Sequence, residues 1–181
     1  MIENIKETAI PGCFQIKLKV FADMRGHFIK TFHSEEFRKY NLETDYKEEY
    51  YSISQKNVLR GMHFQKPPSD HVKIVYCTSG RVQDVLIDLR KESPAFGKHL
   101  SFELQANDGQ LIYMPKGVAH GFLSLEENSI LMYKVSSVHV PQDDCGIRWD
   151  SCGILWETTQ DLIISDRDKN LNVFSEYKNL W

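Results

Sequence analysis

Short runs of β-branched and aromatic residues, separated by turn residues, recur along the sequence. The longest helix-like stretch, residues 34–40, is long enough for only one or two turns, and Ser34 is its expected N-cap. Short strands without helices between them indicate an antiparallel sandwich or barrel and disfavour a parallel α/β fold. We therefore predict an all-β fold, with strands at residues 59–65, 72–77, 82–89, 110–114, 121–125 and 130–135.

Composition and charge exclude several classes of protein. The chain has 181 residues, of which 41% are hydrophobic, and this suits one compact domain over residues 1–181. Its formal net charge is -3 with no basic stripe, which disfavours nucleic-acid binding. We find no signal peptide and no apolar run of membrane-spanning length, so we expect a soluble, cytoplasmic protein. The four cysteines form no C-x-x-C pair, and we expect free thiols, most of them buried.

Side-chain alternation along two of these strands indicates which residues share a face. Tyr133 shares its face with apolar Leu131. In the other strand, His63 shares a face with Gly61, whereas Arg60 points to the opposite side of a regular strand. If Arg60 and His63 are to reach one site, a bulge or bend near Gly61 has to supply the turn.

One motif is typical of cupin barrels. Residues 109–120 match a glycine, five residues and then Pro-x-Gly-x-x-His, which ends at His120. Metal-binding cupins carry His-x-His and a glutamate in the preceding motif, but that region reads His63-Phe64-Gln65 here. With so few ligands of the usual pattern, we expect no metal site.

A more extensive resemblance rests on residues 57–65, which are similar to the V-L-R-G-L-H-x-Q motif of the dTDP-4-dehydrorhamnose 3,5-epimerase family. Members of this family are metal-free cupins of deoxysugar biosynthesis. Residues 23–26 resemble the family's D-x-R-G. The resemblance covers residues 8–170, and its further segments are residues 84–90, 93–97, 115–122, 133–134 and 146–150.

The resemblance implies both a fold and an activity. The fold would be a cupin-type jelly-roll β-barrel with a few short helices and the substrate in the barrel mouth. The activity would be inversion of C3, C5 or both in a nucleotide-linked 4-keto-6-deoxy sugar, through an enolate and without a cofactor. The protein would serve cell-surface polysaccharide synthesis as a homodimer whose N-terminal strands join the neighbour's sheet.

The resemblance also implies catalytic roles, and each answers a need of the reaction. His63 would abstract the proton beside the ketone as a general base, and Asp168 would orient its ring. Lys73 would stabilise the enolate oxygen, where charge develops. Because inversion needs a proton returned from the opposite face, Tyr133 would act as the acid.

Further residues are expected to bind the substrate. By resemblance, Arg60 and His120 would lie near the sugar and pyrophosphate, and Arg25 would reach the pyrophosphate, for which a planar guanidinium is suited. A solvated structural role is the alternative for all three. The remaining histidines are expected to be structural or exposed; they are His27, His33, His71, His99 and His139.

Three segments depart from the family's pattern where the nucleotide is expected to bind. The glutamate of D-x-R-G-x-F-x-E is Lys30, and a usual Gln-x-Asn reads Glu48-Glu49-Tyr50. A tyrosine expected beyond Tyr133 is Val138. We infer that catalysis is kept while the carrier is cytidine or guanosine diphosphate rather than deoxythymidine diphosphate. Glu48 would accept a hydrogen bond from an exocyclic amine, which thymine lacks.

Several alternatives stay open at this level. The enzyme could invert only C3 or only C5, because one base and one acid can serve either carbon. A cupin 3,4-ketoisomerase is a second alternative, although the V-L-R-G-M-H string at residues 58–63 argues against it. A non-catalytic sugar-nucleotide binding protein and a metal-dependent oxygenase are further possibilities on the same barrel.

Overall fold

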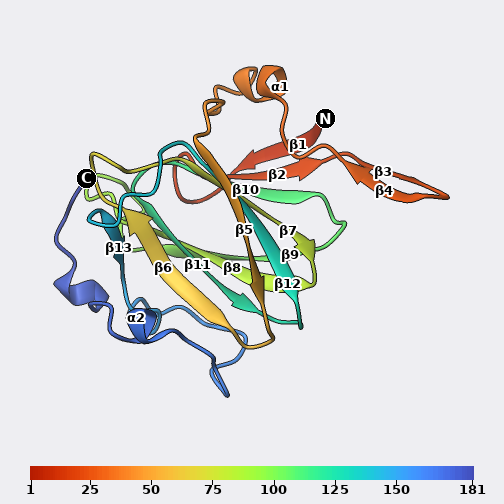
Figure 1. Ribbon diagram of the computed structural model, residues 1–181. Helices are drawn as coiled ribbons and strands as arrows, with labels where there is room; N and C mark the ends of the chain where they lie inside the picture. Colours follow the sequence, from red (N-terminus) through yellow and green to blue (C-terminus); the bar gives the residue numbers. More distant parts are fainter.

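The computed structural model describes residues 1–181 as two antiparallel β-sheets packed face to face, a jelly roll of the cupin type (Figure 1). The first sheet has the order β1 (Ile2–Glu7), β2 (Phe14–Leu18), β10 (Gln110–Met114), β7 (Lys73–Ser79), β12 (Ser129–Val135), β5 (Glu48–Ser54). The second has the order β13 (Asp144–Gly146), β6 (Leu59–Gln65), β11 (Val118–Ser124), β8 (Arg81–Asp88), β9 (His99–Gln105). The all-β prediction is confirmed.

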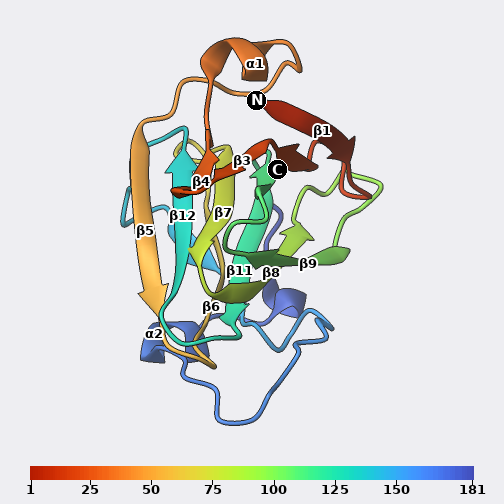
Figure 2. The same ribbon diagram turned by 90° about the vertical axis from the view of Figure 1, so that its right-hand side faces the viewer.

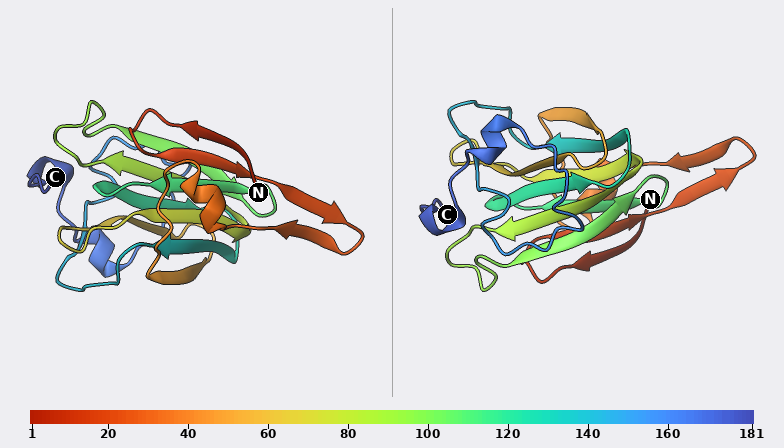
Figure 3. Two further views of the ribbon diagram at one scale, coloured as in Figure 1. Left: turned by 90° about the horizontal axis from the view of Figure 1, so that it is seen from above. Right: turned by 90° about the horizontal axis from the view of Figure 1, so that it is seen from below.

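The remaining elements lie outside the two sheets. A separate hairpin of β3 (Val20–Asp23) and β4 (Gly26–Ile29) projects from the body, as both views of Figure 3 show. Two short helices, α1 (Ser34–Arg38) and α2 (Asp166–Lys169), lie at opposite ends of the molecule (Figure 2). A single 3-10 turn, Phe174–Glu176, follows α2. No helix is long and apolar enough to cross a membrane.

Apolar side chains pack in three layers around the sheets. The central core lies between the sheets and joins residues such as Val75 of β7 to Leu86 and Phe122 of the facing sheet. A second cluster covers the outer face of the second sheet, where the C-terminal segment contributes Trp156. A third covers the outer face of the first sheet and includes Phe37 of α1. The C-terminal segment is thereby held against the barrel, which matters for the position of α2.

The predicted strands are all present, and two of them, β6 and β10, have the predicted bounds. The predicted N-cap of the first helix is wrong. Ser34 is already helical, and His33 before it has the extended backbone of a cap, with φ -153 and ψ 113, but no side-chain hydrogen bond. All four cysteines are free thiols, and Cys13 and Cys77 are buried.

The predicted irregularity near Gly61 is confirmed. The pairing of β6 with β11 shifts register between His120 and Phe122, opposite this glycine. Gly61 has a φ of +136, which favours glycine, and a Cβ there would lie 2.5 Å from the Cα of Gly121. The missing side chain therefore allows β11 to approach closely and β6 to bend.

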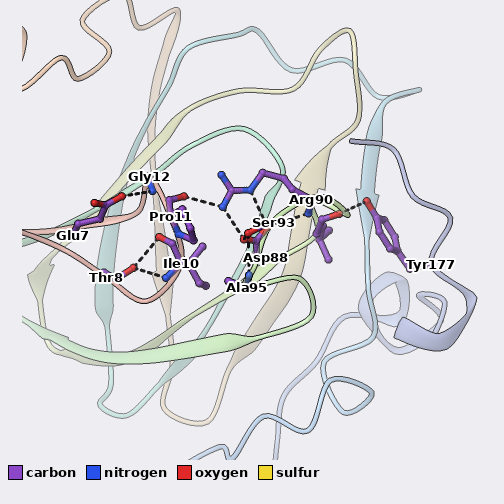
Figure 4. A network of polar contacts seen from close by, with 11 residues as sticks. Glu7, Thr8, Ile10, Pro11, Gly12, Asp88, Arg90, Ser93, Ala95 and Tyr177 are labelled. Carbon is purple, nitrogen blue, oxygen red and sulfur yellow. Dashed lines mark hydrogen bonds and ion pairs between the residues drawn. The ribbon is translucent and has the colours of Figure 1, made fainter.

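A polar network fixes the N-terminal segment to the end of β8 (Figure 4). Asp88 is fully buried and accepts hydrogen bonds from Arg90 and from the hydroxyl of Ser93 at 2.6 Å. Arg90 also donates to the carbonyl oxygen of Pro11 at 2.8 Å. Burial opposes the charge of Asp88, but these hydrogen bonds hold its pKa below the usual range.

Candidate active site

One cavity of about 540 Å³ opens in the body of the jelly roll, a size that suits a small-molecule ligand. Both sheets contribute to its lining, together with the segment after β12 and one residue of α2. Seven of the predicted site residues line it: Glu48, Tyr50, Arg60, His63, Lys73, His120 and Tyr133. The bend at Gly61 explains how Arg60 and His63 both reach this cavity from one strand.

Asp168 lies directly behind His63. The Nε2 atom of His63 is 2.7 Å from Oδ1 of Asp168, and the other carboxylate oxygen accepts the backbone N–H of Gly61 at 3.1 Å. Asp168 is only 3% exposed, so it is not the exposed turn carboxylate that a short loop can provide. Burial opposes its charge, yet the hydrogen bond with His63 holds its pKa below the usual range. Because a carboxylate accepts, Nε2 carries the proton and Nδ1 is left as the basic nitrogen.

Tyr133 is held among several groups on the other sheet. The predicted face is confirmed, since Leu131 and Tyr133 are both buried. The phenol oxygen lies 3.3 Å from Oγ of Ser52, and the ring stacks on Tyr50 with centroids 4.8 Å apart and planes at 16°. Burial raises the pKa of Tyr133, so its hydroxyl stays protonated over the physiological range.

Lys73 supplies a buried ammonium group to the cavity wall. The side chain is 8% exposed. Burial lowers its pKa to about 8, and the carboxylates of Asp84 and Asp144 partly oppose that shift. The amine therefore carries a proton at neutral pH and can stabilise a developing negative charge.

A second imidazole–carboxylate pair lies nearby. Nε2 of His120 is 2.6 Å from Oδ1 of Asp84, and both side chains are buried. Burial lowers the pKa of His120, although Asp84 partly offsets this. The second oxygen of Asp84 is buried without a hydrogen-bond partner. Asp84 thus contacts His120 directly, and its charge also acts on Lys73, although it was not among the predicted site residues.

Strand β5 forms one wall of the site through alternate residues. Oε1 of Glu48 accepts the backbone N–H of His139 at 2.9 Å, which ties β5 to the segment after β12. Tyr50 and Ser52 contact Tyr133, and Oγ of Ser54 accepts from Nε of Arg60 at 3.2 Å. Ser52, which lines the cavity, and the buried Ser54 were missed because the strand that carries them was not predicted from the sequence.

Other residues of the cavity were also missed. His71 and His139, predicted to be structural or exposed, both line it. Burial lowers the pKa of His71 to about 3, with contributions from neighbouring cations. Arg167 lines the cavity from α2 and forms an ion pair with Asp144 at 2.9 Å. Arg167 could have been predicted as a site residue from the sequence, because it immediately precedes the predicted site residue Asp168.

Arg25 and Lys30 are not brought to this cavity. Arg25 lies at the turn of the projecting hairpin, where it pairs with Asp23 and its side chain is 86% exposed. Lys30 follows the last residue of β4 and is also exposed. Because the hairpin extends away from the body, neither side chain reaches the cavity of its own chain (Figure 3).

No group of three or more His, Cys, Asp or Glu side chains is arranged to hold a metal ion. The cavity instead gathers an oriented imidazole, a buried ammonium group and a buried phenol. A cupin-type jelly roll with such groups on one cavity belongs to the class of enzymes that move protons on a bound substrate.

The family model described as dTDP-4-dehydrorhamnose 3,5-epimerase matches residues 7–176. The chain belongs to this family and is an isomerase.

Individual relatives match over most of their length. The chain is 37% identical over 176 residues to dTDP-4-dehydrorhamnose 3,5-epimerase of Escherichia coli K12, with 96% of this chain and 95% of the relative covered. The epimerase of Legionella pneumophila, solved in complex with dTDP-4-keto-L-rhamnose, gives a TM-score of 0.92 at 29% identity and coverages of 97% and 94%. A 3'-monoepimerase of Streptomyces bikiniensis, solved with dTDP-quinovose, gives 0.88 at 27% identity and coverages of 93% and 86%.

Proposed function

We propose that this enzyme inverts C3, C5 or both in a nucleotide-linked 4-keto-6-deoxy sugar, in the biosynthesis of deoxysugars for cell-surface polysaccharide. The observation that carries the proposal is the presence of His63, backed by Asp168 at 2.7 Å, and the buried Tyr133 on the same cavity. Inversion of a carbon centre needs a base on one face of the enolate and an acid on the other, and His63 and Tyr133 come from the two facing sheets.

In the proposed mechanism, Nδ1 of His63 removes the proton from the carbon beside the ketone. Asp168 holds the ring in the tautomer with Nε2–H and stabilises the imidazolium that forms. The electron pair of the broken C–H bond moves into the enolate. A positioned base of this kind contributes roughly 10²–10⁴-fold to the rate.

The enolate oxygen is stabilised by fixed donors. Lys73 carries a proton at neutral pH and is surrounded by protein, so its charge acts at a low dielectric. Arg60 and His120 line the same cavity and are assigned to the sugar and its pyrophosphate. Tyr133 then returns a proton to the opposite face of the enolate. The phenolate regains a proton from water, and the imidazolium of His63 releases the abstracted proton to water.

We propose that the protein acts as a homodimer, because two predicted binding residues lie outside the cavity of their own chain. The projecting hairpin exposes Phe21 at 57% and Phe28 at 61%, a pair of apolar rings without cover. Contact of this hairpin with a second copy of the chain would cover the two rings and bring Arg25 and Lys30 to the neighbour's cavity. Light scattering of the purified protein tests this. A monomeric and active protein would overturn it, and mixed dimers of Arg25→Ala with His63→Ala that regain activity would support it.

Glu48 and Tyr50 favour a second candidate for the nucleotide carrier. One oxygen of Glu48 is held by the backbone N–H of His139, which leaves the other as an acceptor at the cavity. Neither carboxylate nor phenol reproduces the paired donor and acceptor of an amide. We therefore propose cytidine or guanosine diphosphate as the alternative carrier to deoxythymidine diphosphate. Equal affinities in calorimetric titrations of the three diphosphates would remove the basis for this alternative.

The experiment that tests the activity uses a panel of nucleotide-linked 4-keto-6-deoxy sugars in heavy water. NMR then measures deuterium at C3 and at C5, so it also separates a double epimerase from a mono-epimerase. Exchange at either carbon supports the proposal and identifies the carrier. Movement of the carbonyl to C3 with deuterium at C4 would identify the ketoisomerase alternative. No exchange with any sugar would favour the binding-protein alternative, and metal analysis of the purified protein tests the oxygenase.

We propose a cytoplasmic location and a single domain on separate grounds. All four cysteines are free thiols, as is usual for cytosolic proteins. Residues from both sheets and from the C-terminal segment share the three apolar clusters, which supports folding as one unit. Cell fractionation and a single unfolding transition in urea would test the two proposals.

A further inference from the structure

Tyr50 has an unusual relation to the phenol that the proposed mechanism uses as its acid. The two residues are directly opposite in the antiparallel pairing of β5 with β12. Their rings lie 4.8 Å apart and nearly parallel, at 16°. Tyr50 is 41% exposed whereas Tyr133 is 6% exposed, so Tyr50 forms the outer layer of the stack.

The other contacts of the Tyr133 side chain leave its direction weakly fixed. Its hydroxyl has one hydrogen-bond partner in the protein, Oγ of Ser52 at a long 3.3 Å. The ring of His120 meets it at 74°, with centroids 6.0 Å apart. The flat face against Tyr50 is the closest of its ring contacts. Loss of that face would leave space into which the phenol could turn.

We propose that Tyr50 is a positioning residue, which holds Tyr133 by ring stacking in the direction from which the enolate is reprotonated. Through this contact Tyr50 sets the fraction of enolates that are inverted rather than returned to starting material. The inference rests on the proposed epimerase function. It gives Tyr50 a role other than the nucleotide contact predicted from the sequence.

The proton balance makes this role measurable. His63 breaks the C–H bond and becomes an imidazolium, which exchanges its proton with heavy water. If the imidazolium returns a deuteron, the sugar keeps its configuration and carries deuterium. If Tyr133 donates instead, its O–D bond breaks, a C–D bond forms on the opposite face, and the sugar is inverted. Deuterium in the recovered substrate and in the inverted product therefore reports the two routes separately.

The experiment compares variants of β5 in heavy water with deoxythymidine-diphosphate-linked 4-keto-6-deoxyglucose, or with the carrier that the panel identifies. Tyr50→Ala removes the stack, and Tyr50→Phe keeps the ring without its hydroxyl. Tyr51→Ala is the matched control, because Tyr51 is the neighbouring tyrosine on the opposite face of β5 and is 61% exposed. NMR measures the ratio of exchange with retention to inversion, and initial rates give kcat and KM.

We expect Tyr50→Ala to raise the ratio of retention to inversion by about 10-fold to 100-fold, because a displaced catalytic group loses rate of that order. The effect should lie in kcat for inversion, while His63-dependent exchange continues. Tyr50→Phe should restore the ratio of the unaltered enzyme, and Tyr51→Ala should not change it.

Two results would overturn the inference. A higher KM for Tyr50→Ala with an unchanged ratio would make Tyr50 a nucleotide contact only. An equal loss of inversion in Tyr50→Ala and Tyr50→Phe would assign the effect to the hydroxyl group of Tyr50 rather than to ring stacking. Failure of the proposed function looks different, since the unaltered enzyme would then show neither exchange nor inversion. Circular dichroism of Tyr50→Ala checks that the variant is folded.

Discussion

His63 and Asp168 are 105 positions apart in the sequence, yet Nε2 of the imidazole lies 2.7 Å from the carboxylate. Helix α2 supplies the carboxylate, and Ser165 caps this helix by accepting from the backbone N–H of Asp168. The packing of the C-terminal segment on the outer face of the second sheet therefore decides the orientation of a group inside the jelly roll. This relationship links the fold to the proposed chemistry.

Replacing Asp168 by asparagine should lower kcat/KM by about 10²–10⁴-fold, because an amide can donate to Nε2 and favour the wrong tautomer of His63. Nucleotide binding should change little, since Asp168 lies behind the imidazole. Steady-state kinetics and calorimetry with the nucleoside diphosphate measure the two effects. A comparable loss of nucleotide affinity would contradict the orienting role.

The pKa of Lys73 predicts an alkaline limit to activity. The protonated amine stabilises the enolate, and burial lowers its pKa to about 8. Activity should therefore be present below this pH and fall as the pH rises through about 8. The variant Lys73→Arg should lose that limb, since a guanidinium stays protonated. A pH profile of kcat/KM that is flat to pH 10 would contradict the assignment.

The buried charge of Lys73 should also lower the free energy of unfolding at neutral pH. Its pKa is lower in the folded protein than the ordinary 10.5, so the unfolded chain binds more protons between about pH 8 and 10.5. The free energy of unfolding should therefore rise as the pH rises through that window. Below about pH 8 the amine is protonated in both states, and the folded protein carries the whole cost of burying its charge. Lys73 forms no direct ion pair, so Lys73→Met should remove the desolvation cost and stabilise the protein at pH 7 by roughly 1–3 kcal/mol while abolishing activity. Urea unfolding measures this, and a destabilised variant would argue against a desolvation penalty.

The network around Asp88 should contribute to stability rather than to chemistry. Arg90→Met leaves a buried carboxylate without its partner and should cost about 3–5 kcal/mol. Because the pKa of Asp88 is lowered, the contribution of the pair is present above the usual carboxyl pKa and lost as the pH falls below it. The exposed pair of Arg148 with Asp150 provides the control, where Arg148→Met should cost below about 1 kcal/mol. Equal costs would contradict the role of burial.

Local patterns were sufficient for much of the fold. The period-two alternation around Tyr133 correctly gave its inward face, and turn residues delimited β6 and β10. The first helix shows the limit of such patterns, because Ser34 and His33 differ in backbone angles that residue type alone does not determine. The strands before β6 were not predicted, and neither were β9 and β13. In β1 and β5 most residues are exposed or half-buried and give little hydrophobic contrast.

Site residues could be predicted where they lie in a sequence motif. They could not be predicted where their place in the site depends on contacts between distant parts of the fold. His63 and Tyr133 lie in segments that resemble the family's motifs, and both reach the cavity. Asp84 was missed because β8 is buried on both faces, so alternation does not distinguish a site residue from a core residue. Arg25 depends on how the hairpin meets another surface, which no local pattern encodes.

The assignment of base and acid is decided by comparing His63→Ala with Tyr133→Phe in heavy water, with the substrate that the panel identifies. We expect His63→Ala to lose all deuterium exchange beside the ketone. Tyr133→Phe should keep exchange but lose most of the inversion, because the base remains and the acid is gone. The reverse pattern, with exchange surviving in His63→Ala and lost in Tyr133→Phe, would contradict the assignment of base and acid.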